Sequence, residues 1–181
     1  MIHKDDWEIV FQWGLIALEK IESNWFERAV RPPWVRLILK NSKWEILVTR
    51  EHRHEHDSFD YRIPGWKVFD DLASYLAVRE NKEALEEWVI AAAKLEAKEE
   101  AWIDEISDIE ISHISKAWAT VDWTLYYVSG TITKQWEQTL TGDEWEHWVE
   151  VLFYSSEELL KLMKSWLMLE ERSVGVLLKY V

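Results

Sequence analysis

Apolar and polar residues alternate along residues 34–56, and this alternation predicts a β-hairpin. If Asn41 and Ser42 form a two-residue turn, the apolar side chains of both strands share one face. The pairs expected on that face are Leu39 with Trp44, Leu37 with Ile46 and Val35 with Val48. The same face continues into Arg50, His52, His54 and His56. The pattern therefore predicts a sheet face that is apolar along most of its length and titratable at one end.

Apolar residues three and four apart predict helices on both sides of the hairpin. The first helix is expected to begin near Asp5 or Asp6 and to end at Pro32 and Pro33. A long acidic helical region is expected over about residues 66–106, with a break near Asn81. Its expected apolar stripe consists of Leu85, Trp88, Ala92, Leu95, Trp102 and Ile106.

The last third of the chain predicts a three-stranded antiparallel meander over residues 118–128, 131–140 and 145–154. Ser129-Gly130 and Gly142-Asp143 suit its two turns. The cross-strand rows expected are Trp123, Trp136 and Val149, and Tyr127, Ile132 and Phe153. After the meander, Ser155 and Glu158 form a capping box for a helix to about Glu171, and residues 174–181 are expected as a final strand.

These segregated elements predict an α+β fold in a single domain of residues 1–181. A subdomain break, if there is one, is expected near residues 107–117. The expected order is an N-terminal helix and β-hairpin, a long acidic helical region, the meander, a helix and a final strand.

Charge and composition narrow the function. The chain has 181 residues, a net charge of −13 and no cysteine, which excludes disulfides and thiolate metal sites. The excess of acidic residues predicts a basic protein partner and argues against direct binding of nucleic acid. No apolar run approaches the roughly 18 residues of a membrane helix, so we expect a cytoplasmic protein without a membrane partner.

The alternating histidines suggest a metal site. Two imidazoles on strand residues two apart can converge on one ion, completed by a nearby carboxylate such as Asp57 or Asp60. The candidate ligands are His52, His54, His56 and Asp57. The neighbouring Arg50 and Arg53 form an alternative anion-binding pocket.

The acidic region suggests a docking surface. Like charges one turn apart destabilise a helix, so their persistence calls for either a basic partner or simple tolerance on a solvated face. The candidate partner-binding residues are Glu83, Glu87, Glu96, Glu100, Asp104 and Asp108.

Three functions remain open at this point. The composition resembles that of toxin-immunity proteins and phage-encoded inhibitors, so the preferred hypothesis is a non-enzymatic inhibitor of a basic, nucleic-acid-targeting partner that needs no cofactor. The alternative is a metal-dependent hydrolase or phosphoesterase that uses a divalent transition metal at the histidines. The third is a structural subunit of a larger assembly. The five dispersed glycines form no phosphate-binding loop, which argues against an enzyme.

Overall fold

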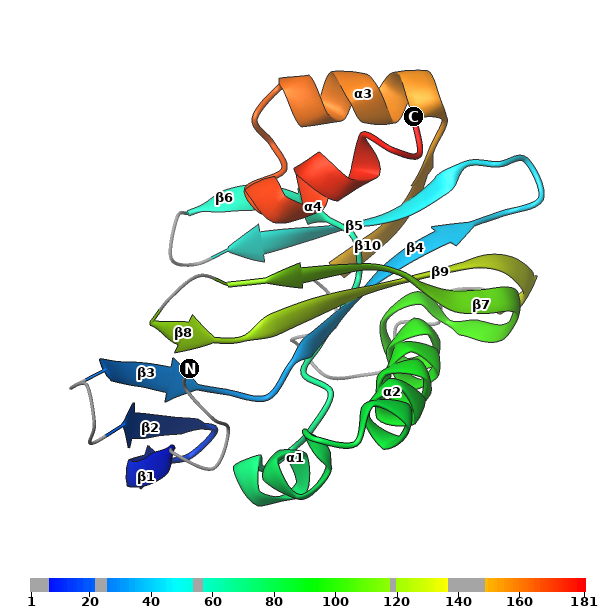
Figure 1. Ribbon diagram of the computed structural model, residues 1–181. Coiled ribbons are helices and arrows are strands. Elements are labelled where there is room, and N and C mark those ends of the chain that lie inside the picture. The colour runs from blue at the N-terminus through cyan, green and yellow to red at the C-terminus, as the bar shows by residue number, and fades with distance from the viewer. Residues whose placement is uncertain (1–6, 22–25, 54–56, 118–119, 137–148) are drawn as a thin grey trace.

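The computed structural model describes residues 7–21, 26–53, 57–117, 120–136 and 149–181. These residues form two β-sheets and four helices (Figure 1). The small sheet contains, in spatial order, β1 (Glu8–Trp13), β2 (Ile16–Ile21), β3 (Phe26–Val30) and β8 (Val121–Asp122). The large sheet contains β10 (Val149–Tyr154), β5 (Ile46–Arg53), β4 (Trp34–Lys40), β9 (Thr124–Gln135) and β7 (Ile103–Lys116), while β6 (Ser58–Arg62) pairs with β5.

Helices lie on both faces of the large sheet (Figure 1). One face is covered by α1 (Leu72–Val78) and α2 (Lys82–Ala101), and the other by α3 (Ser156–Lys164) and α4 (Glu171–Leu177). Within the part of the chain that the structure describes, no helix combines the length and apolar character needed to cross a bilayer. The subdomain break expected near residues 107–117 falls largely inside β7.

β4 and β5 are paired at only one position, Lys40 with Ile46, and then diverge. The chain after β6 fills the resulting gap, because the N–H groups of Leu37 and Val35 donate to the carbonyls of Pro64 and Trp66 at 2.8 and 2.9 Å. A Cβ on Gly65 would lie 2.0 Å from the Val35 carbonyl oxygen. Only glycine therefore allows so close an approach between these two segments.

The predicted hairpin register is wrong. The side chain of Asn41 accepts hydrogen bonds from the N–H groups of Lys43 and Glu45, which gives a longer loop than the expected two-residue turn. Because strand side chains alternate, this change moves the residues of β5 to the opposite faces. Leu37 consequently shares a core with Leu47. The residues that were expected opposite the β4 apolar positions, Ile46 and Val48, pack in the other core.

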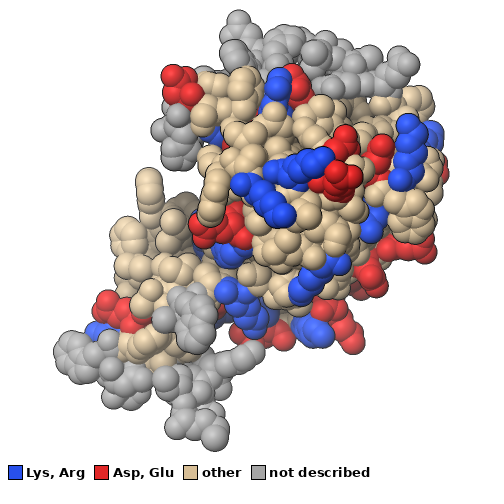
Figure 2. Space-filling model, turned by 90° about the horizontal axis from the view of Figure 1, so that it is seen from above, with Lys and Arg blue, Asp and Glu red and all other residues tan. Residues whose placement is uncertain are grey.

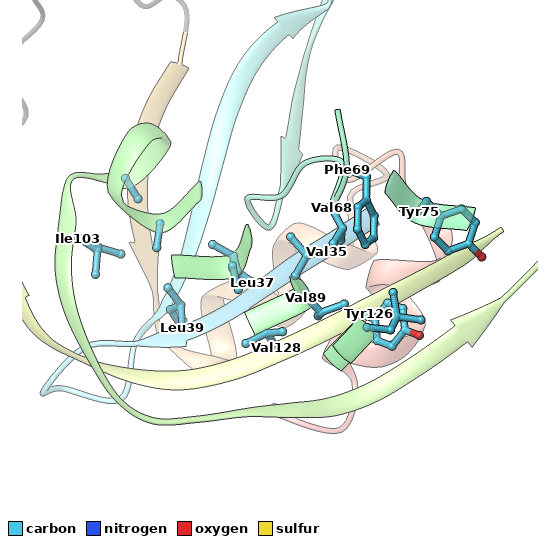
Figure 3. Packing of buried hydrophobic residues seen from close by; sticks show 14 of the residues in the cluster. Val35, Leu37, Leu39, Val68, Phe69, Tyr75, Val89, Ile103, Tyr126 and Val128 are labelled. Carbon is cyan, nitrogen blue, oxygen red and sulfur yellow. The ribbon is translucent and has the colours of Figure 1, made fainter. Parts of the chain in front are cut away.

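The two cores lie on opposite faces of the large sheet. Figure 3 shows the first, where side chains of β4 and β9 meet those of α1 and α2. Its labelled members are Val35, Leu37, Leu39, Val68, Phe69, Tyr75, Val89, Ile103, Tyr126 and Val128. The second joins the sheet to α3 and α4 through residues such as Ile38, Tyr127, Leu159 and Leu177.

The predicted N-terminal helix is wrong, since its described residues form β1, β2 and β3. Strand β2 buries every second residue, and the middle one of these is Glu19, which is only 1% exposed. Arg28 and Arg79 both donate hydrogen bonds to the Glu19 carboxylate. An acidic residue at an inward position concealed the strand alternation in the sequence.

The long helical region is also predicted wrongly. It contains two helices, and α2 ends where Trp102 adopts a left-handed conformation with φ of 53°. The chain then continues as β7, including the predicted helical position Ile106. Two members of the expected stripe, Trp88 and Leu95, are 49% and 56% exposed. The true buried stripe contains Leu85, Val89, Ala93, Glu96, Ala97 and Ala101, whose alanines allow α2 to approach the sheet closely.

The predicted meander does not form. β9 runs straight through Ser129 and Gly130, pairing with β4 on one side and β7 on the other. A Cβ on Gly130 would lie 2.4 Å from the Cγ2 atom of Ile106, so this glycine permits close strand packing rather than a turn. Tyr127 and Ile132 consequently belong to one strand, and β10 pairs with β5. Residues 137–148, with the second expected turn, lie outside the described residues.

The end of the chain confirms one local prediction and contradicts another. Ser155 and Glu158 form the expected capping box at the start of α3, although the helix ends at Lys164. The expected final strand over residues 174–181 is wrong, because its first half belongs to α4 and the rest is not a strand. The described residues therefore form a mostly β structure with short helices, and the predicted α+β arrangement is wrong.

Candidate functional site

α2 carries one acidic residue on the stripe that packs against the large sheet. The other buried positions of the helix hold only Leu, Val and Ala. Glu96 occupies one of these positions and is 5% exposed. Its Oε1 atom has no hydrogen-bond partner among the described residues. An incompletely bonded buried carboxyl group is costly, so its presence in an apolar stripe indicates a functional site.

Glu100 follows Glu96 by one helical turn and is hydrogen-bonded to it. Burial raises the pKa of Glu96 to about 9, and the negative charge of Glu100 is the second cause. Burial also raises the pKa of Glu100, against the opposing effect of its hydrogen bond to Glu96. The two carboxyl groups therefore hold a proton between them at neutral pH.

Charged side chains of the large sheet change the pKa of this acidic pair. The negative charge of Glu51 on β5 raises the pKa of Glu100, while the positive charges of Arg36 and Arg62 lower it. Both arginines are oriented by carboxylates, with nitrogen–oxygen distances of 2.7 Å from Arg36 to Glu170 and 2.9 Å from Arg62 to Asp60. The site therefore combines a protonated acidic pair with fixed positive charges.

The acidic pair fits a hard divalent cation. Carboxylate oxygens are the ligands that Mg²⁺ and Mn²⁺ prefer, and a cation would supply the partner that the Oε1 atom of Glu96 lacks. Among the described residues, no three His, Cys, Asp or Glu side chains are grouped to hold one ion. Mg²⁺ commonly takes only one or two protein carboxylates and completes its shell with water and substrate phosphates. Glu96 and Glu100 therefore suffice as the protein ligands of such a site.

The six acidic residues expected to dock a basic partner do not share one helix face. Glu83 and Glu87 are exposed on α2, whereas Glu96 is buried and Glu100 is half-buried. The other two, Asp104 and Asp108, lie on β7. Binding of a basic partner by the exposed members stays a prediction.

The histidine cluster is described only in part. The Nε2 atom of His52 lies 3.4 Å from the Oδ1 atom of Asp57, so these two predicted ligands are brought together. His54 and His56 lie outside the described residues. Metal binding by the cluster stays a prediction, and alternation along β5 places His52 on the opposite face from Glu51.

The two arginines of the expected anion pocket each have a carboxylate partner. The Nη2 atom of Arg50 lies 2.6 Å from Glu150, and that of Arg53 lies 2.6 Å from Glu51. Anion binding by this pair stays a prediction.

We compared the chain with known protein families, curated proteins and solved structures. No protein family and no curated protein matches the sequence. A solved structure titled "Crystal structure of ADP compounds hydrolase" is similar, with a TM-score of 0.61 and 18% sequence identity. The similarity covers 95% of this chain and 88% of that chain. At this level of identity the similarity shows the fold alone.

This comparison contradicts the function preferred from the sequence. The prediction of a non-enzymatic inhibitor or immunity-type protein is wrong, because the chain shares its fold over 95% of its length with a protein whose structure is titled as a hydrolase. The prediction rested on net charge, which governs solubility and association but does not determine the fold. The hydrolase alternative agrees better with the fold.

Proposed function

We propose that this protein is a metal-dependent hydrolase that acts on ADP-containing compounds, with Glu96 and Glu100 holding the cation. The observation that carries the proposal is the buried Glu96 carboxyl group, whose Oε1 atom lacks a partner among the described residues. The fold shared with an ADP compounds hydrolase supports the same substrate class.

The cation would supply Lewis-acid activation of a phosphoanhydride group in the substrate. Glu96 and Glu100 would hold the cation as ionised carboxylates, because a nearby positive charge favours the loss of their shared proton. Arg36 and Arg62 lower the pKa of Glu100, so their positive charges favour the ionised carboxylates. Arg36 lies on the α4 side of the large sheet, where it is bonded to Glu170. Arg62 is held in position by Asp60, so it can orient substrate phosphates with little loss of side-chain freedom on binding.

The histidines offer a second candidate for the metal ligands. The approach of His52 to Asp57 supports this alternative, since an imidazole and a carboxylate can bind one transition metal. The two candidates use opposite faces of β5. They are therefore separable by mutation.

The test is hydrolysis of ADP-linked compounds with added Mg²⁺ or Mn²⁺, followed by chromatography of the released nucleotide. Glu96→Gln and Glu100→Gln should each reduce turnover by at least about 100-fold, as expected for loss of a group that stabilises developing charge. Glu83→Gln, an exposed substitution on the same helix, should leave turnover unchanged. Loss of activity in His52→Ala with full activity in Glu96→Gln would instead assign the metal to the histidines.

A further inference from the structure

Two arginines differ from all the others because they form no ion pair with any carboxylate that the structure describes. Of the eight arginines in the sequence, six form ion pairs with carboxylates: Arg28, Arg36, Arg50, Arg53, Arg62 and Arg79. Arg31 and Arg172 form none among the described residues. In a chain with a net charge of −13, two such guanidinium groups in one place are unexpected.

Both of these arginines stack on the same indole ring. The guanidinium carbon of Arg172 lies 4.4 Å from the ring centroid of Trp123, and that of Arg31 lies 4.9 Å from it. One indole ring is therefore within cation–π distance of two guanidinium groups.

Three separate parts of the fold hold this cluster in place. Arg31 lies between β3 and β4, Trp123 lies between β8 and β9, and Arg172 belongs to α4. The N–H of Arg31 donates to the carbonyl of Asp122 at 3.2 Å, and Trp123 packs against the second core. Trp34 meets Trp123 edge to face, with a centroid distance of 6.2 Å. The cluster is therefore built before any ligand arrives.

The cluster is rich in hydrogen-bond donors that lack acceptors. The Nε atom of Arg31 and the Nε1 atom of Trp123 are buried without a hydrogen-bond partner among the described residues. Burial also lowers the pKa of the Arg31 guanidinium. Unsatisfied buried donors are rare in folded proteins and call for a bound acceptor.

Positive and negative side chains are mixed on the face of the molecule that carries α4. Figure 2 shows the molecule from the side on which α3 and α4 lie, where Lys and Arg side chains are interspersed with acidic ones. The strong negative charge of the chain is therefore not uniform over this face.

We propose that Arg31, Arg172 and the indole N–H of Trp123 bind a phosphate group of a small molecule. Guanidinium groups match phosphate oxygens in geometry and charge, and two of them balance a doubly charged anion. Because the guanidiniums already occupy the stacking positions on the indole, the site recognises the phosphate rather than a nucleobase. This proposal goes beyond the proposed hydrolase function, since it requires neither a cation nor the Glu96–Glu100 pair.

If the cluster has only a structural role, we expect a different effect of Trp123→Phe. If stacking of guanidinium on indole were its whole purpose, Trp123→Phe would preserve much of it, because phenylalanine keeps an aromatic ring but has no N–H. The phosphate site needs that N–H as a hydrogen-bond donor. The same substitution therefore separates the two roles.

The experiment is calorimetric titration of the full chain with inorganic phosphate and with AMP, in the absence of divalent cations and at constant ionic strength set with chloride. Wild-type protein should bind both ligands. Arg31→Gln and Arg172→Gln should each abolish binding, and Trp123→Phe should weaken it about tenfold, as expected for loss of one hydrogen bond to a charged group. Lys161→Gln removes one positive charge at an exposed position of α3 and should bind as wild type does.

Two further results decide the proposal. If Arg31→Gln does not fold, Arg31→Lys keeps the charge and should bind more weakly than wild type because its ammonium lacks the bidentate geometry. Absence of phosphate binding by the wild-type protein overturns the proposal, as does equal binding by Arg172→Gln, Trp123→Phe and Lys161→Gln. Glu96→Gln should bind phosphate normally, so failure of the hydrolase proposal is distinguishable from failure of this one.

Discussion

Glu96 and Glu100 lie one turn apart on α2 and are joined by a hydrogen bond between their carboxyl groups. Such a pair is unfavourable unless one group is protonated or both contact a cation. Both states can be measured. A protonated pair makes the stability of the protein depend on pH, and a pair that binds a cation releases protons when it does so.

The first prediction concerns the free energy of unfolding as pH rises. The pKa of Glu96 is raised to about 9 in the folded state, whereas the unfolded chain releases this proton near the ordinary value of 4.5. The folded state therefore binds more protons between these values, and its stability falls as pH increases through them. Glu96→Gln remains neutral throughout. Between about pH 5.5 and about pH 8.5, it should lose about 1–3 kcal/mol less stability than wild type in urea denaturation.

Glu83→Gln is the matched control for this effect, since Glu83 is exposed on the same helix. Its dependence of stability on pH should follow that of the wild type. Equal slopes for all three proteins would mean that the Glu96 carboxyl group is ionised in the folded state at neutral pH.

The second prediction concerns proton release on cation binding. Because the pKa values of Glu96 and Glu100 are raised, a divalent cation must displace a proton to bind them. Affinity for Mn²⁺ should rise with pH between about 6 and about 8.5. Calorimetry in two buffers with different ionisation enthalpies should show the released proton. If Mn²⁺ affinity does not depend on pH, or if Glu100→Gln leaves it unchanged, Glu96 and Glu100 are not the metal ligands.

The third prediction concerns two glycines in different surroundings. Gly130→Ala forces a methyl group against Ile106 and should destabilise the fold by about 1–3 kcal/mol. Gly175→Ala on α4 meets no atom within 4 Å and should stabilise the protein by about 0.5–1 kcal/mol. Chemical denaturation measures both changes.

A double substitution identifies the cause of the Gly130 effect. Ile106→Ala removes the Cγ2 atom that the new methyl group would contact. In that background Gly130→Ala should lower the free energy of unfolding by much less. An undiminished cost would point to the neighbouring Ser107 carbonyl oxygen, which would lie 3.2 Å from the new Cβ.

The fourth prediction concerns the buried Glu19 carboxylate. It accepts hydrogen bonds from Arg28 on β3 and from Arg79, which directly follows α1. Glu19→Gln leaves two partly buried cations without their shared counter-charge and should destabilise the protein by about 3–5 kcal/mol. Glu27→Gln, at an exposed position of β3, should change stability by less than about 0.5 kcal/mol. Thermal denaturation of both variants makes the comparison.

Local signals in the sequence predicted structure only where local contacts determine it. The capping box of Ser155 and Glu158 is such a case, because both residues belong to one helical turn. Ser129-Gly130 has the composition of a turn but lies inside β9, where a neighbouring strand rather than the local chain requires glycine. Tertiary contacts of this kind are not visible in a short window of sequence.

The sequence identifies the acidic residues of the candidate site but not their burial. The sequence predicts Glu96 and Glu100 as like charges one turn apart on a partner-binding surface, whereas the structure buries Glu96. The large residues Trp88 and Leu95 dominated the predicted stripe, although both are substantially exposed. The spacing of Ala93, Ala97 and Ala101 marks the buried side, and with it the position of Glu96.

The two ends of α2 are determined by different capping interactions. The side chain of Asn81 accepts a hydrogen bond from Ala84 at the start, and the left-handed Trp102 ends the helix just before β7. Each residue of an α-helix turns it by about 100°, so one residue inserted or deleted between these caps would swing Glu96 away from the sheet. During evolution this segment should therefore accept exchanges on its outer surface freely while keeping its length constant.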